Sequence, residues 1–316
     1  MKKLMTLALA AGMLLGAATG ASAIDFKAKG QWLMGFSAGD GSLVSHVKDN
    51  KASNHNKAAD TDDIFGASQR VRLQLDAVAS EALSGTVFFE IGDQVWGDND
   101  NGGALGADGK VVELKRAYID WMVPQTDLKV RMGIQGIALP SFTTNASQIM
   151  DDDVAAISLN YQFNENVALT ALWARPYNDN AGYYRNSDFL HKGSQYGNYM
   201  DNMDIFAVLL PLSFDGVKVT PWIMYSALGP GMFDFKRNPG GVPTGLASFG
   251  NAWGRAGSGM TSGFFGSDKW DSYGNAFWAG VTGEVTLWDP FRIAWDVNYG
   301  SASYENEKMN REGWLA

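Results

Sequence analysis

Five basic residues stand in segments where apolar and polar residues alternate. Arg70 and Arg72 lie in QRVRLQLD, Arg116 in LKRAYIDW, and Lys129 and Arg131 in LKVRMGIQ. Successive side chains of an extended chain point to opposite faces, so each closely spaced pair shares one face. Cations on a surface that lines a water-filled space set up an electric field that orients and filters charged solutes.

Acidic residues offer the opposite charge. Asp151, Asp152 and Asp153 form a run, and Glu90 and Asp120 stand in the alternating segments. One hypothesis sets Arg70, Arg72, Arg116 and Arg131 on one wall, facing the three aspartates. The alternative is that all these charges are ordinary solvated residues that pair with one another. The aspartate run could also bind Ca²⁺ through hard oxygen ligands, although a solvated turn is favoured because consecutive side chains alternate in direction.

Nucleophilic catalysis needs a histidine or carboxylate held beside a nucleophile. The three histidines, His46, His55 and His191, all fall in long polar segments. We therefore expect no enzyme, no bound metal and no cofactor.

Period-two alternation recurs along the whole chain and predicts an all-β protein of about eleven strands. Most of the segments are near ten residues, which suits a tilted membrane-spanning strand better than a sandwich strand. They are 26–36, 69–78, 85–95, 114–121, 128–135, 157–163, 167–176, 203–212, 217–226, 275–285 and 291–300.

The connections between these segments alternate between long and short. The polar stretch 39–63 is followed by SEAL (80–83), and 177–202 is followed by SFDG (213–216). Antiparallel up-and-down barrels have this pattern because one rim carries tight turns and the other carries extended loops. The aromatic residues at both ends of the segments match the two interfacial belts of a membrane protein.

The aliphatic rows are therefore expected to face lipid and the polar rows to face water inside the barrel. An Arg or Lys on the lipid face costs about 2–4 kcal/mol at mid-bilayer, so the charged rows belong inside. The expected wet-facing residues are Lys27, Lys29, Arg70, Arg72, Arg116, Lys129, Arg131 and Arg292, with Asp76, Glu90, Asp120, Glu284 and Asp296.

Residues 1–23 have a basic start, an apolar run and a small-residue cleavage site at Ala21-Ser22-Ala23, as a secretory signal peptide does. Its removal leaves 23 basic against 34 acidic residues and a net charge of −11, which excludes a nucleic-acid binder. The chain has no cysteine. An exported protein of this kind is held by its backbone and packing alone.

The segments QRVRLQLDAVASEALSGTVFFEIGD, LKRAYIDW and LKVRMGIQ resemble the general homotrimeric porins of Gram-negative outer membranes, especially those of sulfate-reducing bacteria. The resemblance covers residues 24–316, as one barrel domain. It implies a 16-stranded transmembrane barrel in the outer membrane, in contact with lipid and lipopolysaccharide, that passes small hydrophilic solutes and ions. It also implies that the third long loop, about 136–153, folds inward and narrows the lumen opposite a basic ladder.

One feature departs from this family. The final segment, SYENEKMNREGWLA, has no descending alternating run, so we expect a barrel that lacks C-terminal strands. A substrate-specific outer-membrane channel is the nearest alternative, with Tyr118 and Trp278 as inward aromatic residues. A secreted β-sandwich binding protein is a more distant one.

Overall fold

The computed structural model describes residues 24–39, 64–99, 102–106, 112–144, 147, 149–177, 202–228, 273–305, 307 and 310–316. The expected signal peptide lies outside these residues. No helix in the described part of the chain is long and apolar enough to cross a membrane. The strands are β1 (Asp25–Gly39), β2 (Ile64–Ser80), β3 (Leu83–Val95), β4 (Val112–Met122), β5 (Leu128–Ala138), β6 (Asp151–Gln162), β7 (Ala168–Tyr177), β8 (Met203–Leu209), β9 (Leu212–Phe214), β10 (Val217–Leu228), β11 (Gly274–Trp288), β12 (Phe291–Tyr304) and β13 (Arg311–Leu315).

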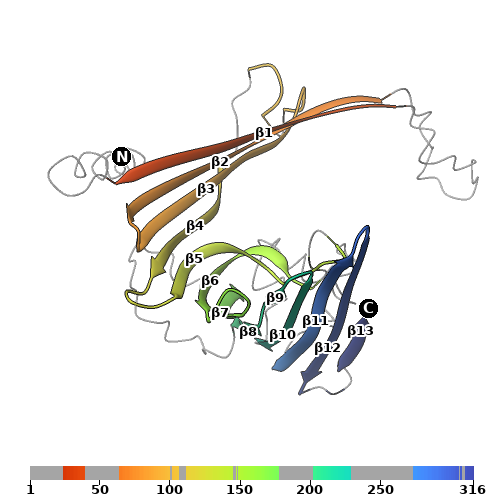
Figure 1. Cartoon of the computed structure of the whole chain (residues 1–316). Helices are drawn as coiled ribbons and strands as arrows, with labels where there is room; N and C mark the ends of the chain where they lie inside the picture. The colour runs from red at the N-terminus through yellow and green to blue at the C-terminus, as the bar shows by residue number, and fades with distance from the viewer. Residues whose placement is uncertain are drawn as a thin grey trace, which may run out of the picture. The chain divides into compact units, whose positions relative to one another are not determined.

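The strands follow one another in an antiparallel, up-and-down order (Figure 1). The sheet runs from β1 to β13 in chain order, except that the three residues of β9 pair with β10 beside β8. The fold is therefore all-β and antiparallel, as the alternating segments predicted.

Two strands differ from the sequence prediction. The expected segment 203–212 is divided into β8 and β9, because Pro211 has no backbone N–H to offer the ladder. Strand β13 was not predicted, since its residues REGWL alternate poorly. It pairs with β12 from Asn298↔Leu315 to Ala302↔Arg311, so the closing segment does contain a strand.

The chain divides into two units, which are described separately. Within the described residues, unit 1 consists of 24–78 and 86–115, and unit 2 of 79–85 and 116–316. Strand β4 contributes residues to both units.

The two faces of the sheet in unit 2 differ in chemistry. We call the face that carries Lys129 and Arg131 the polar face. The opposite face, the apolar face, carries aliphatic and aromatic side chains that remain exposed: Ile134 39%, Leu159 40%, Phe206 50%, Ile223 52%, Val281 40% and Val297 42%. These side chains are exposed, so in unit 2 this face is not the buried inner face of a sandwich.

The polar face is polar over only part of its area. Toward the ends of the strands that lead into long connections, β8, β10 and β11 place apolar side chains on it. These form a buried cluster whose members include Met203, Ile205, Met224, Trp278 and Ile137. The polar face is therefore not uniformly accessible to water, because residues of the β5–β6 connection cover this region.

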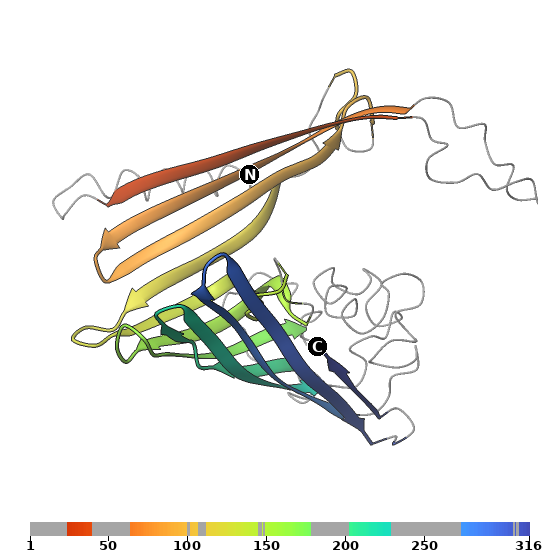
Figure 2. The ribbon, with the colours of Figure 1, turned by 45° about the vertical axis from the view of Figure 1, so that its right-hand side comes forward.

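The contacts of that connection require the sheet of unit 2 to curve. Strand β5 ends at Ala138, and the amide of Phe142 donates to Thr282 Oγ1 on β11 at 3.2 Å. Four strands separate β5 from β11, which in a flat sheet would place them about 24 Å apart. Four extended residues span at most about 14 Å. The polar face is therefore concave, and Figure 2 shows the curvature of this sheet from β5 to β12.

Replacing Gly133 by alanine is expected to destabilise the pairing of β4 with β5. The φ of Gly133 is +129°, and a Cβ there would lie 2.2 Å from the carbonyl oxygen of Ala117. Strained backbone and this clash should lower the free energy of unfolding by about 2 kcal/mol or more, measured by urea titration in detergent. The control is Gly85→Ala, whose Cβ would lie 3.9 Å from the nearest backbone atom. An equal loss in both variants would contradict the prediction.

Candidate constriction loop and charged wall

The connection between β5 and β6 comprises residues 139–150, of which 145, 146 and 148 are outside the described part. It is shorter than the expected 136–153, because Gly136–Ala138 still belong to β5 and Asp151–Asp153 already belong to β6. The three aspartates therefore lie in a strand and not in a turn.

Asp296 on β12 anchors this loop to the polar face. Its carboxylate accepts hydrogen bonds from Ser141 Oγ at 2.6 Å and from the backbone amides of Phe142 and Thr143 at 3.4 and 3.3 Å. The Thr143 hydroxyl and the Thr282 hydroxyl of β11 also donate to it. Hydrogen bonds to a charged acceptor are worth about 1.5–3 kcal/mol each, so this group fixes the loop strongly.

Two further contacts hold the same loop. Arg292 Nη2 on β12 donates to the carbonyl oxygen of Phe142 at 2.8 Å. At the base of the loop, Leu139 N donates to Met150 O at 2.9 Å, and both side chains are buried in the apolar cluster together with Ile149. The loop is thus held by its apolar base and by its hydrogen-bonded segment 141–143.

The predicted residues Asp120, Lys129 and Arg131 come together on the polar face. Arg131 Nε and Nη2 donate to the two carboxylate oxygens of Asp120 at 2.6 and 2.8 Å, and Lys129 Nζ lies 3.0 Å from Asp120 Oδ2. The Arg131 guanidinium also lies over the ring of Tyr118, 4.0 Å from its centroid. One carboxylate therefore serves two cations.

Arg116 does not join this row. Its Nε donates to Asp153 Oδ1 at 2.5 Å, and its guanidinium covers the position that a Cβ of Gly136 would occupy. Asp153 is paired with Gly136 in register, and Gly136 is two residues from the exposed Ile134, so both are on the same face of the sheet. The Arg116–Asp153 pair therefore lies on the apolar face, beside the strand ends that lead into the loop. The predicted wet-facing position of Arg116 is corrected accordingly.

Asp151 and Asp152 are placed opposite Ala138 and Ile137 in the β5–β6 register. Asp152 Oδ1 accepts a hydrogen bond from the amide of Asp153 at 2.7 Å. The described residues contain no group of three or more His, Asp or Glu side chains that could hold a metal ion.

In unit 1, each of the predicted arginines has a carboxylate partner. Arg72 Nε donates to Glu90 Oε2 at 2.6 Å, and Arg70 Nε and Nη2 donate to Asp93 at 2.6 and 2.5 Å. Asp93 was not predicted, because strict alternation puts it on the face opposite Glu90. Gly92 has a φ of +113° and breaks the alternation at this point. A glycine inside a strand pattern is the sequence signal of such an irregularity.

The apolar face carries a second ion pair near strand ends. Arg175 on β7 donates twice to Asp204 on β8, with both distances 2.9 Å, and Trp173 Nε1 donates to Asp204 at 2.8 Å. The pair is next to the long connection 178–201, so a charge on this face is tolerated where the strand ends.

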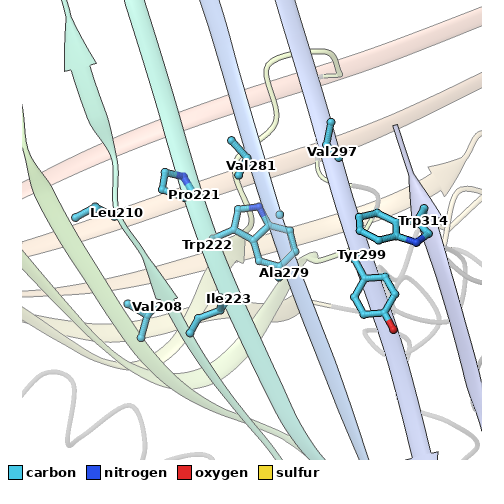
Figure 3. Close-up of a pocket in the computed structure, with 11 residues that line it drawn as sticks. Val208, Leu210, Pro221, Trp222, Ile223, Ala279, Val281, Val297, Tyr299 and Trp314 are labelled. Atoms are coloured by element: carbon cyan, nitrogen blue, oxygen red, sulfur yellow. The ribbon is translucent and has the colours of Figure 1, made fainter.

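The apolar face also has an open depression of about 580 Å³ over β8, β10, β11, β12 and β13 (Figure 3). Its lining side chains include Val208, Ile223, Val281, Val297 and Trp314. They offer almost no polar surface, so the depression is unsuited to a hydrophilic solute.

The histidines His46, His55 and His191 lie outside the described residues. The expectation that the chain is not an enzyme stays a prediction.

No family model matches this chain, and no curated protein matches it. Among solved structures, it is similar to OmpT (in-vitro folded), an outer membrane protein of Vibrio cholerae, in its trimer form. The identity is 10%, the match covers 93% of this chain and 82% of that chain, and the TM-score is 0.36. A TM-score this low does not establish a shared fold, so the function below is inferred from the contacts of this chain.

Replacing Asp296 by alanine is expected to release loop segment 141–143, because four hydrogen bonds from this segment to the carboxylate are lost. The chain has no cysteine, so Thr144→Cys provides a single site for a nitroxide spin label. The electron paramagnetic resonance spectrum of the label should show faster motion when Asp296→Ala is added. The control is Asp76→Ala, which removes a carboxylate bonded to Gln74 and Thr86 in unit 1. Unchanged label motion in the Asp296→Ala background would contradict the anchoring role.

Proposed function

We propose that this chain forms a water-filled channel of the porin type in a bacterial outer membrane, which passes small hydrophilic solutes and ions. The loop formed by residues 139–150 narrows the water path, and the apolar face meets lipid. The observation that carries the proposal is the anchoring of this loop by Asp296 across a concave polar face, while the opposite face leaves large apolar side chains exposed.

The charged residues are consistent with a polar surface that lines a water-filled path. In unit 2, Asp120, Lys129 and Arg131 border the path. Within unit 1, Arg70, Arg72 and Glu90 form a polar row of their own. A concave wall of this kind needs water, because ion pairs that remain partly exposed are otherwise costly to desolvate. Export is the part of the proposal that rests on the signal-peptide pattern of residues 1–23. A homotrimeric assembly and contact with lipopolysaccharide rest on the sequence resemblance.

The substrate-specific channel is less well supported. A track of aromatic side chains for stacking sugars would need free ring faces on the polar side. The ring of Tyr118 is covered by Arg131, and Trp278 is fully buried in the apolar cluster. A diffusion channel is therefore the better interpretation of these two residues.

Proteoliposomes that contain the purified full-length chain are expected to swell in neutral sugars, at a rate that falls steeply with solute size. Diffusion through a narrowed water path depends on size and does not saturate with concentration. Saturation of the rate by one sugar would favour the substrate-specific channel instead. No swelling and no ion conductance in planar bilayers would refute the channel.

The orientation of the two faces gives a second prediction. Val281 lies midway along β11 on the apolar face, and an arginine there should cost about 2–4 kcal/mol of folding free energy in lipid vesicles. Urea titration measures this cost, with Val281→Leu as the same-site control. Thr286→Arg, on the exposed polar side of β11, should cost much less. Folding of the chain without detergent or lipid, unaffected by Val281→Arg, would support a secreted sandwich and contradict the proposal.

A further inference from the structure

A recess of about 370 Å³ lies on the polar face of β5, β6 and β7. Its polar lining is built from cross-strand neighbours: Lys129 pairs with Asn160, Asn160 pairs with Thr170, and Arg131 pairs with Ser158. Ile137 and Leu209 line the recess and also belong to the apolar cluster at the base of the loop. The recess is therefore directly beside the anchored loop.

The recess carries an excess of positive charge. Lys129 and Arg131 share one carboxylate, that of Asp120, and no carboxylate is among the residues that line the recess. The side chain of Asp120 is 16% exposed, whereas those of Lys129 and Arg131 are 37% and 28% exposed. The cations are therefore more accessible from the recess than the anion that they share.

The recess also has more hydrogen-bond donors than acceptors. Asn160 Oδ1 accepts from Thr170 Oγ1 at 2.8 Å, which leaves the Asn160 amide Nδ2 without a partner among the described residues. Gln135 is satisfied at both ends, because Nε2 donates to Ala156 O and Oε1 accepts from Ser158 Oγ. An ammonium has three N–H donors and a guanidinium has five, so Lys129 and Arg131 keep donors beyond those that Asp120 accepts.

We propose that this recess binds a small hydroxylated organic anion, such as a sugar phosphate or a sugar acid, and so concentrates it next to the narrowest part of the water path. The anionic group meets Lys129, Arg131 and the Asn160 amide. The carbon skeleton lies against Leu172 and Leu209, and the ligand hydroxyls bond to Ser158. A volume of about 370 Å³ suits such a solute, because small-molecule sites begin at about 300 Å³. As a step in permeation, the site rests on the proposed channel function.

Unit 2 contains a matched control for charge alone. Lys218 Nζ and Arg292 Nε lie 2.9 and 2.8 Å from the two carboxylate oxygens of Glu284. Two cations again share one carboxylate on the polar face, but none of the three residues lines the recess. Lys218→Met therefore removes the same charge as Lys129→Met and leaves the recess intact.

The test is equilibrium binding of glucose 6-phosphate to the detergent-purified full-length chain, measured by isothermal titration calorimetry. Lys129→Met and Asn160→Asp should each weaken binding at least tenfold, because each removes a charge-assisted or donor contact. Lys218→Met should change it less than twofold. Glucose and inorganic phosphate should each bind at least tenfold more weakly than glucose 6-phosphate.

Several outcomes overturn the inference. These are equal weakening by Lys129→Met and Lys218→Met, unchanged binding in Asn160→Asp, or inorganic phosphate binding as well as glucose 6-phosphate. Variants are compared only if their heat-modifiable gel mobility, a test of folding, matches that of the parent chain. Lys129→Met and Asn160→Asp each test the recess independently of the other. Conductance of the parent chain in KCl separates the two proposals: conductance without binding refutes the recess alone, and binding without conductance refutes the channel alone.

Discussion

The hydrogen bonds to Asp296 are the contacts on which the arrangement of unit 2 depends. They join a loop that begins after β5 to two strands that lie on the far side of the sheet order. Because so few residues separate Ala138 from Phe142, this connection exists only if the intervening strands curve around the polar face. The curvature in turn makes the opposite face convex, and alternation places the exposed aliphatic and aromatic side chains on that face.

The polar face has two regions with different physical roles. Beside the loop, Met203, Met224 and Trp278 join Leu139 and Ile149 in a buried apolar cluster, which fixes the loop by packing. Toward the short turns, charged residues stay partly exposed and pair with one another. In unit 2 the groups Asp120–Lys129–Arg131 and Glu284–Lys218–Arg292 each contain one more cation than anion, whereas Asp296 is surrounded by neutral donors. In the proposed channel, this local charge excess, and not the number of basic residues, would set the field that a solute meets.

Much of the fold and part of the site could be predicted from alternation. It identified the strands other than β9 and β13 and placed Lys129, Arg131 and Asp120 on one face. It failed where a strand is irregular. Gly92 interrupts the alternation of side chains in β3, so Asp93 as well as Glu90 accepts a hydrogen bond from an arginine. The paired register of β4 with β5 begins at Ala117, so Arg116 is outside this hydrogen-bonded ladder. Its guanidinium lies over Gly136, which has no side chain to block it.

The sequence by itself determined the all-β class and the antiparallel order, because period-two alternation and turn spacing act within a few residues of one another. It also determined which residues are charged in each row. Only the tertiary structure decided that Asp296 anchors the loop, that the loop ends at 139 and 150, and that Lys129, Arg131 and Asn160 share a recess. Those contacts join residues that lie far apart in the chain, and the curvature of the sheet, which brings them together, leaves no periodic signal in the sequence.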